Sequence, residues 1–517
     1  MKHVSGFLFL FLFTCIRPLS AQSEALFDDS RVSAIFIELP ADSFDYLISN
    51  LVNEHYFKAR FIFDDGQTRD TVEDAGLRLR GNTSLYAQKK SFKISFNEFV
   101  PDRKYQGVKK LNLRGQHNDP TMVREKLFYE VWNKAGMPER RAAFVKVFIN
   151  QQYRGLYTNM EEIDKTWLGR VYDDNDGNLY KCTWPADLDY HGPVQLPYKT
   201  ILNNPDTRAY DLTTNELSDD YSRLVALITA LYQPVNAGFP DQINQILNVD
   251  GVLKAFALDV ATGNWDDYFY NKNNYYLYDN PSTGRFEFIT FDTDNTFGVD
   301  WLGKDWATRN CLAWQKGNEP RPLATKLLAV PAFKAKYVRY LDTLTRLLLL
   351  PDSIFPRIDA LRDLIAPAAA TDLFRSLDYG YDMADFENGF EQTVDGHTPY
   401  GIKPFLGIRG DSIRSQIAGL LTETKAPEAP PFVFEVYPNP AAEQIFVQCA
   451  PELFSEHIRG AAFEASGRLV GGWDWEAGKG PFAISIGDLP AGLYVLSLST
   501  DRWNKRVVFL KGTEMGK

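Results

Sequence analysis

Four side chains with oxygen donors surround a short aromatic-rich region near the middle of the chain. Asp266, Asn274, Asp292 and Asp294 all fall within residues 264–298. Carboxylate and amide oxygens are the ligands that Mg²⁺ and Mn²⁺ prefer, together with the phosphates that such ions carry. Acids beside strands are also common as simple turn residues, so this segment alone is compatible with either interpretation.

A predicted β-hairpin in the same segment would bring these side chains together. Residues 274–278 and 285–291 are rich in aromatic residues, and a turn at 279–284 separates them. Because the polar residues stand at both ends of the hairpin, we expect them to converge. Trp265 could form one wall of such a site, although a place in the core is the more frequent use of tryptophan.

A possible cationic counterpart comes earlier in the chain. Arg78 and Arg80 precede a Gly-Asn turn, and residues 89–96, KKSFKISF, follow as a predicted strand. Cations on a strand beside a glycine turn can face phosphate oxygens, although most strand lysines point to solvent. Lys90 or Lys93 could therefore contact a phosphate chain.

A carboxylate after another predicted strand could hold one of these lysines. Glu161 follows residues 155–160 and could act as the glutamate of the kinase lysine–glutamate pair does. The alternative is an acid that favours the dipole of a following helix. Phosphoryl transfer also needs metal ligands and a group that orients the acceptor hydroxyl, which Asp266, Asn274 and Asp292 could supply.

Composition limits the possible classes of protein. The 517 residues allow a large domain and a smaller module, and the hydrophobic content of 44% indicates a folded chain. A net charge of −11 argues against non-specific nucleic-acid binding. The chain has no GxxxxGK[ST] loop and no GxSxG elbow, and its six histidines form no HExxH pair. P-loop chemistry, serine hydrolysis of that type and histidine-based zinc hydrolysis are therefore disfavoured.

The first residues predict export. Residues 1–21 have a basic start, an apolar core and a small residue at the end, which is typical of a secretory signal. No later segment has the pattern of a transmembrane helix. Cys182, Cys311 and Cys449 remain after the signal, and an odd, widely spaced set is no disulfide framework. A Cys182–Cys311 bridge is possible, and buried free thiols are the alternative.

The remaining chain divides at a proline-rich linker, residues 422–431. Before it, residues 28–421 predict an α+β domain that is strand-rich at first, with one helix at 121–135, and helix-rich later, with helices at 249–262 and 323–350. After it, residues 432–517 show short strands and glycine turns, which predict a small β-sandwich.

Several runs in order resemble a known family. They are RLRGNTS…KKSFKISF, LNLRGQHNDPTMVREKLFYEVWNKAGMPE, FVKVFINQQYRGLYTNMEEIDK, GNWDDYFYNKNNYYLYD…GRFEFITFDTDNTFG and GIKPFLGIRGDSIRSQI. Together they resemble the CotH (spore coat protein H) family of atypical, secreted protein kinases, over residues 32–421. The resemblance implies a kinase-like two-lobed fold that uses ATP with Mg²⁺ or Mn²⁺. The GxGxxG, HRD and DFG motifs of ordinary kinases are absent.

The resemblance also assigns roles to individual residues. It implies Asp266 as the catalytic aspartate and Asn274 and Asp292 as metal ligands. Asp294, two residues after Asp292, is a further candidate for a second metal contact. Lys90 and Glu161 would form the phosphate-side pair, with Lys89 and Lys93 as alternatives because strand alternation leaves the facing lysine open. Arg80 and Arg124 match arginine positions of the family pattern, so they are expected to line the nucleotide site.

The C-terminal module has its own resemblance. The runs YPNP, SGR, LPAGLY and KRVVFLK, in this order, resemble the sorting domain of the type IX secretion system. This implies passage through the periplasm, handling by that machinery, and a secreted or cell-surface location, with the module removed on export.

The sequence therefore predicts a secreted kinase that transfers the ATP γ-phosphoryl group to Ser/Thr-type hydroxyls of proteins on the cell surface or outside the cell. The first alternative is a non-catalytic adhesin or matrix protein on a kinase-like fold. A glycoside hydrolase that pairs Asp266 with Asp292 is a third interpretation.

Overall fold

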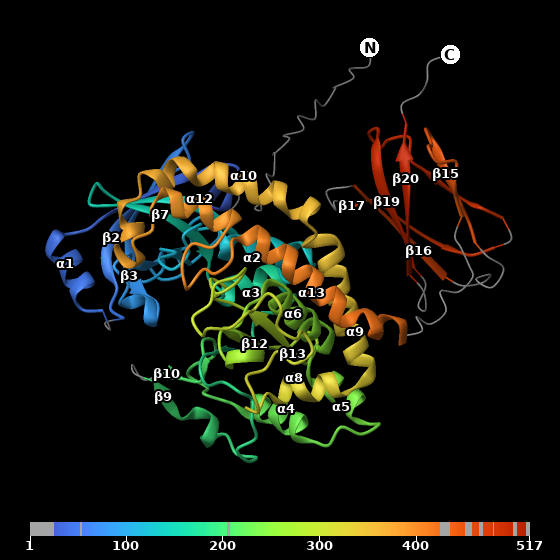
Figure 1. The fold of residues 1–517 in the computed structure, drawn as a ribbon, viewed down its shortest axis with the longest axis horizontal. Coiled ribbons are helices and arrows are strands. Elements are labelled where there is room, and N and C mark those ends of the chain that lie inside the picture. The colour runs from blue at the N-terminus through green and yellow to red at the C-terminus, as the bar shows by residue number, and fades with distance from the viewer. Residues whose placement is uncertain are drawn as a thin grey trace, which may run out of the picture. The chain divides into compact units, whose positions relative to one another are not determined.

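The computed structural model describes residues 25–51, 54–203, 207–423, 435–449, 457–464, 469–478, 480–499 and 504–512. The chain divides into two compact units, residues 1–422 and 423–517 (Figure 1). The first unit combines helices with sheets and the second contains strands, so the predicted α+β domain followed by an all-β module is confirmed. The predicted signal, 1–21, and most of the predicted linker, 422–431, lie outside the described residues.

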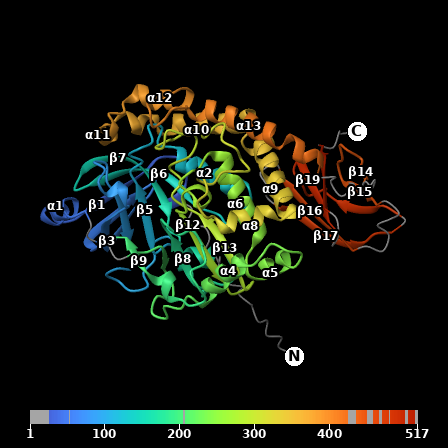
Figure 2. The same cartoon turned by 60° about the horizontal axis from the view of Figure 1, so that its bottom comes forward.

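A closed seven-stranded barrel forms the beginning of the first unit, in the order β1-β2-β3-β4-β5-β7-β6 (Figure 2). The pair β1–β6 is parallel and the other neighbours are antiparallel. Helix α1 (Ala41–Ser49) follows β1, and α2 (Arg124–Lys134) separates β5 from β6. The strands are β1 Ser33–Glu38, β2 Phe57–Asp64, β3 Arg69–Arg80, β4 Ser91–Ser95, β5 Lys110–Arg114, β6 Ala142–Ile149 and β7 Gln152–Glu161.

Alternation along the barrel strands decides which residues face the site. Phe92 and Ile94 of β4 belong to the apolar core of the barrel, as do Leu77 and Leu79 of β3. Successive side chains of a strand point to opposite faces, so Lys93 lies on the outer face. The register pairs Lys93 with Arg78 on one side and with Asn112 on the other, which places these three polar residues in one row across three strands.

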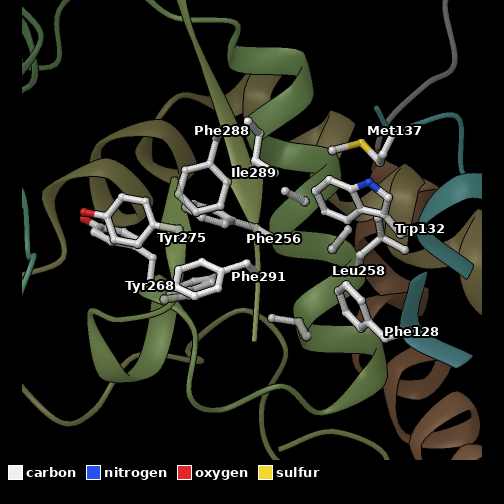
Figure 3. Packing of buried hydrophobic residues seen from close by; sticks show 14 of the residues in the cluster. Phe128, Trp132, Met137, Phe256, Leu258, Tyr268, Tyr275, Phe288, Ile289 and Phe291 are labelled. Atoms are coloured by element: carbon white, nitrogen blue, oxygen red, sulfur yellow. The ribbon is translucent and has the colours of Figure 1, made fainter. Parts of the chain in front are cut away.

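A second sheet, in the order β11-β8-β12-β13, carries the predicted hairpin. The strands β12 (Tyr275–Asn280) and β13 (Arg285–Thr290) confirm the hairpin, with ends within two residues of those predicted. Phe256, on helix α6 (Val249–Thr262), contacts the rings of Tyr268 and Phe288 in the core beneath the sheet (Figure 3). The other two strands are β8 Leu179–Cys182 and β11 Tyr210–Leu212.

Helices surround this sheet and complete the first unit. Helix α6 (Val249–Thr262) has the predicted bounds, and Gly263 ends it in the left-handed conformation. The single helix predicted at 323–350 is wrong, because Pro331 starts a new helix and holds Val330 in an extended conformation. The helices are α3 Lys165–Val171, α4 Ser222–Tyr232, α5 Phe239–Ile246, α7 Tyr268–Asn271, α8 Pro322–Ala329, α9 Pro331–Thr343, α10 Pro351–Ala370, α11 Ser376–Tyr379, α12 Met383–Glu391 and α13 Ile402–Glu423.

Two sheets share one apolar core in the second unit. One has the order β14-β15-β18 and the other β17-β16-β19-β20. Both contribute to the core, for example Ile445 and Ile484 from the first sheet and Leu496 and Phe509 from the second. The strands are β14 Glu435–Tyr437, β15 Gln444–Gln448, β16 His457–Glu464, β17 Leu469–Glu476, β18 Phe482–Ser485, β19 Gly492–Ser499 and β20 Asn504–Lys511.

The structure describes all three cysteines that follow the predicted signal. Cys182, Cys311 and Cys449 are buried free thiols, so the possible Cys182–Cys311 bridge is not formed. No helix in the described part of the chain is long and apolar enough to cross a membrane.

Candidate functional site

A pocket of about 790 Å³ lies where the outer face of the barrel meets the residues flanking β12 and β13. This volume is in the range of ordinary ligand sites. The pocket brings together seven of the nine predicted site residues: Arg80, Lys93, Glu161, Asp266, Asn274, Asp292 and Asp294. Lys90 and Arg124 do not line it. Trp265 does, and its indole N–H donates to the carbonyl of Val299 at 2.9 Å.

Asparagine side chains hold the carboxylate of Asp266. The Nδ2 groups of Asn271, Asn273 and Asn274 donate to it at 2.5, 3.2 and 3.0 Å. Burial raises the pKa of Asp266 to about 6, while the asparagine amides oppose that rise and the charge of Asp292 adds to it. The result is a fixed, desolvated carboxyl group that can accept a proton near neutral pH.

Asn271 was missed by the sequence analysis although its spacing was informative. It stands five residues after Asp266, as the metal-binding asparagine of ordinary kinases follows the catalytic aspartate. The single-turn helix α7, capped by the side chain of Asp267, carries Asn271 back to Asp266. Both residues line the pocket.

Two backbone turns place Asn274 and Asp292 side by side at the end of the hairpin. Both residues have left-handed φ values, 54° and 57°, which asparagine and aspartate adopt more readily than most residues. The N–H of Phe291 donates to the carbonyl of Asn274 at 3.1 Å and joins the two turns. The backbone therefore leaves the β12–β13 strand pairing at Asn274 and Asp292, and both residues line the pocket.

Arg114, at the end of β5, joins the acids of this loop to the barrel. Its guanidinium forms ion pairs with Asp292, with Asp294 at 3.6 Å and with Glu125 at 3.1 Å. Burial alone would raise the pKa of Asp292, but Arg114 and Arg80 outweigh it and lower that pKa. Burial and the neighbouring charge of Asp292 raise the pKa of Asp294 well above its usual range. The two carboxylates therefore crowd each other, which a divalent cation would relieve.

The oxygen donors around these acids fit Mg²⁺ or Mn²⁺. Asn118 donates to Asp294 at 3.4 Å, and its own buried carbonyl oxygen has no partner among the described residues. Across the described chain, no three His, Cys, Asp or Glu side chains gather as a metal cluster. One or two carboxylates completed by amide, water and phosphate oxygens suit Mg²⁺ bound with a nucleotide, so Asp292, Asp294 and the neighbouring asparagines fit such a site.

The lysine–glutamate pair of the pocket is formed by Lys93 and Glu162. The Lys93 Nζ lies 2.8 Å from the Glu162 Oε1, and Asn112 donates to the other carboxylate oxygen at 2.5 Å. Burial lowers the pKa of Lys93 to about 8, although the negative charge of Glu162 acts to raise it. The charges of Lys93 and Arg80 outweigh the burial of Glu162 and lower the pKa of its carboxyl strongly.

The expected pairing of Lys90 with Glu161 is corrected by this geometry. Lys90 precedes the first residue of β4, and its Nζ donates to the carbonyl of Leu85 at 2.7 Å. Glu161 instead pairs with Arg141 and Arg170, each at 2.6 Å. The alternation of β4 turns Lys93 rather than Lys90 toward the pocket.

Lys89 and Arg124 are buried in ion pairs outside the pocket. Lys89 lies 2.5 Å from Asp372 and donates to the carbonyl of Leu156 at 2.8 Å. Arg124 is the first residue of α2 and pairs with Asp119. Asp119 also accepts the backbone N–H of Arg124 at 3.0 Å, so the helix predicted to start at residue 121 begins three residues later.

Comparison with known proteins defines the class. Residues 77–396 match the family model described as CotH kinase protein, so the chain belongs to this family. Inner spore coat protein H of Bacillus subtilis is 26% identical over 59% of this chain and 80% of that protein. Spore coat protein homolog 1 of Rhizopus delemar is 22% identical over 79% of this chain and 68% of its own length. Invasin CotH7 of the same fungus is 23% identical over 67% of this chain and 57% of its own length.

The second unit matches a different family model. Residues 435–509 match the secretion system C-terminal sorting domain. Such a domain is handled by the type IX secretion system, and it supports export to the cell surface or the exterior.

Proposed function

We propose that the first unit is an atypical kinase that transfers the γ-phosphoryl group of ATP to a Ser/Thr-type hydroxyl of a protein at the cell surface or outside the cell. The observation that carries the proposal is the convergence of Asp266, Asn274, Asp292, Asp294 and Lys93 in one pocket. Lys93 comes from a strand far from residues 264–298, which carry the four oxygen donors, and together the five residues provide the parts that phosphoryl transfer requires.

The architecture supports the same proposal. A strand-rich first part and a helix-rich second part border the pocket, which corresponds to the arrangement of a two-lobed kinase. The Lys93–Glu162 ion pair provides the phosphate-side cation with a carboxylate partner, as in kinases. We therefore propose a kinase-like two-lobed fold for residues 28–421.

Asp266 would orient the acceptor hydroxyl and accept its proton. Its raised pKa and its asparagine hydrogen bonds suit a base that is fixed in place before the substrate binds. Asp292, Asp294, Asn274 and Asn118 would hold Mg²⁺ or Mn²⁺, which supplies charge neutralisation on the phosphates when bound. Lys93 would contact the phosphate chain, positioned by Glu162.

Incubation of the purified chain with labelled ATP, Mg²⁺ or Mn²⁺ and candidate surface proteins tests this function. We expect label on serine or threonine with the wild type and none with Asp266→Asn. No label with either metal, together with no binding of ATP in calorimetry, would contradict the proposal.

A second candidate function is non-catalytic adhesion on the same fold. The name of the relative Invasin CotH7 and the Arg114–Asp292 ion pair, which takes up an oxygen of a proposed metal ligand, favour it. An adhesin would bind its partner equally well after Asp266→Asn or Asp292→Asn. A pull-down with the wild type and both variants therefore separates the two functions.

A further inference from the structure

Six lysine and arginine side chains line the pocket, and they fall into two groups. Arg78, Lys93 and Arg114 each form an ion pair with a carboxylate. Arg80, Arg140 and Lys181 line the same pocket but form no direct ion pair with any described residue, although the charges of Asp292 and Glu162 act on Arg80 and Lys181 from a longer distance. Partly buried cations without a directly bonded counter-ion are costly. The second group therefore keeps N–H donors that can bind an anion entering the pocket.

The unpaired cations are largely shielded from water. Arg140 is 5% exposed, and its Nε and Nη1 are buried without a hydrogen-bond partner in the described chain. Burial lowers the pKa of Arg80 and of Lys181, and for Lys181 the positive charge of Arg80 is the next cause. The charge of Arg80 therefore disfavours the charged form of Lys181, while the acids Asp292 and Glu162 partly oppose the effect of burial on both pKa values.

Two tyrosine hydroxyls add donors to this group. Tyr276 is the cross-strand partner of Lys181, so the two side chains leave the same face of the sheet. Tyr276 lines the pocket, and burial and the charge of Glu162 raise the pKa of its hydroxyl while the charges of Arg140 and Arg80 oppose that rise. The buried hydroxyl of Tyr129 lacks a hydrogen-bond partner within the described chain, and its ring lies 4.7 Å from the Arg140 guanidinium.

We propose that Arg80, Arg140 and Lys181, with the hydroxyls of Tyr129 and Tyr276, form a subsite for the phosphate chain of the nucleotide. This subsite rests on the proposed kinase function, and its residues would contact the phosphates in place of a glycine-rich loop. The chain has no GxGxxG motif to cover the phosphates with backbone N–H groups. A chain of several phosphate oxygens can accept hydrogen bonds from cations that come from β3, β8 and the segment just before β6.

Calorimetry of the full chain with inorganic tripolyphosphate tests the subsite without any transfer step. We expect Lys181→Met to weaken binding by about tenfold or more, because a charge-assisted hydrogen bond is lost. Lys181→Arg should retain most of the affinity. Lys165→Met is the matched control, since Lys165 is exposed, pairs with Asp176 and does not line the pocket. Arg80→Met serves as a second variant if Lys181→Met unfolds at a lower temperature than the wild type.

The outcomes separate this inference from the proposed function. Unchanged tripolyphosphate affinity in both Lys181→Met and Arg80→Met overturns the subsite, even if the protein transfers phosphate. Weakened affinity in both, with no transfer by the wild type, supports the subsite and contradicts the kinase. A non-hydrolysable ATP analogue should displace tripolyphosphate. If O-phosphoserine binds at Lys181 while the analogue is also bound, the ligand is a phosphorylated acceptor and the assignment to the nucleotide is overturned.

Discussion

The two walls of the pocket are built in different ways. The barrel wall carries cations, Arg78, Arg80 and Lys93, at alternating positions of regular strands. The opposite wall carries Asp266 and Asp292 in irregular turns at the ends of helices and strands. Strand alternation fixes the direction of a side chain through backbone geometry alone. Turns instead need hydrogen bonds, such as those of the asparagines to Asp266, to hold each carboxylate in place.

The difference suggests how each wall would respond to change. The barrel strands keep their pairing when one outward side chain is replaced, so the loss of a cation there should affect ligand binding more than local order. A carboxylate in a turn is part of a network of amides and one arginine, so its loss should affect both chemistry and local order. Substitutions on the two walls test this contrast.

Asp266→Asn should have the largest effect on activity. The substitution keeps the shape but removes the proton acceptor, so we expect kcat to fall by about 10²–10⁴-fold. ATP affinity measured by calorimetry should change by less than about threefold, because Asp266 does not contact the phosphates in the proposed mechanism. Equal kcat values for the variant and the wild type would remove Asp266 from the chemistry.

Lys89→Met should have the largest effect on stability. It leaves Asp372 buried without its ion-pair partner, which costs about 3–5 kcal/mol of unfolding free energy. Denaturant unfolding followed by circular dichroism measures the change. Lys90→Met is the matched control, since the Lys90 Nζ donates to the Leu85 carbonyl and forms no ion pair with the residues that the structure describes. Identical midpoints for the two variants would show that the Lys89–Asp372 pair does not hold the barrel to the residues after α10.

Lys93→Met should weaken ATP binding by about 10- to 100-fold, the effect of losing one charge-assisted contact to phosphate. Its unfolding midpoint should fall less than that of Lys89→Met, because Glu162 keeps its hydrogen bond from Asn112 and the charge of Arg80, and its side chain is 16% exposed whereas that of Asp372 is 0% exposed. The adjacent lysine variant Lys90→Met should bind ATP as the wild type does. Equal ATP affinities for Lys93→Met and Lys90→Met would contradict the assignment of Lys93 to the phosphate side.

A smaller effect is expected from pH. The pKa of Lys93 is lowered to about 8, so the side chain is charged below that value and loses its proton as the pH rises through it. We therefore expect ATP affinity to fall by up to about tenfold between pH 7 and pH 9. Lys93→Arg keeps its charge over this range, so its affinity should stay constant. A fall of equal size in Lys93→Arg would assign the pH dependence to another group.

Much of the local structure could be predicted from the sequence. Helix α6 has the predicted bounds, because a capping asparagine and a glycine bound it and its apolar pattern is consistent. The sequence left the choice among Lys89, Lys90 and Lys93 open, and the structure settled it by placing Phe92 and Ile94 in the core of the barrel. The five-residue spacing between Asp266 and Asn271 was also visible in the sequence, although it was not used.

Only the tertiary structure decided which charged side chains form ion pairs with each other. Lys93 pairs with Glu162, which lies 69 positions later in the chain, and not with Glu161. Arg114 pairs with Asp292, which lies 178 positions later. The sequence by itself determined the hairpin, the strand that carries Lys93 and the types of side chain available for phosphate and metal, because these depend on local periodicity and turn chemistry. The pairing of charges depends instead on how distant elements pack, and local periodicity carries no information about that.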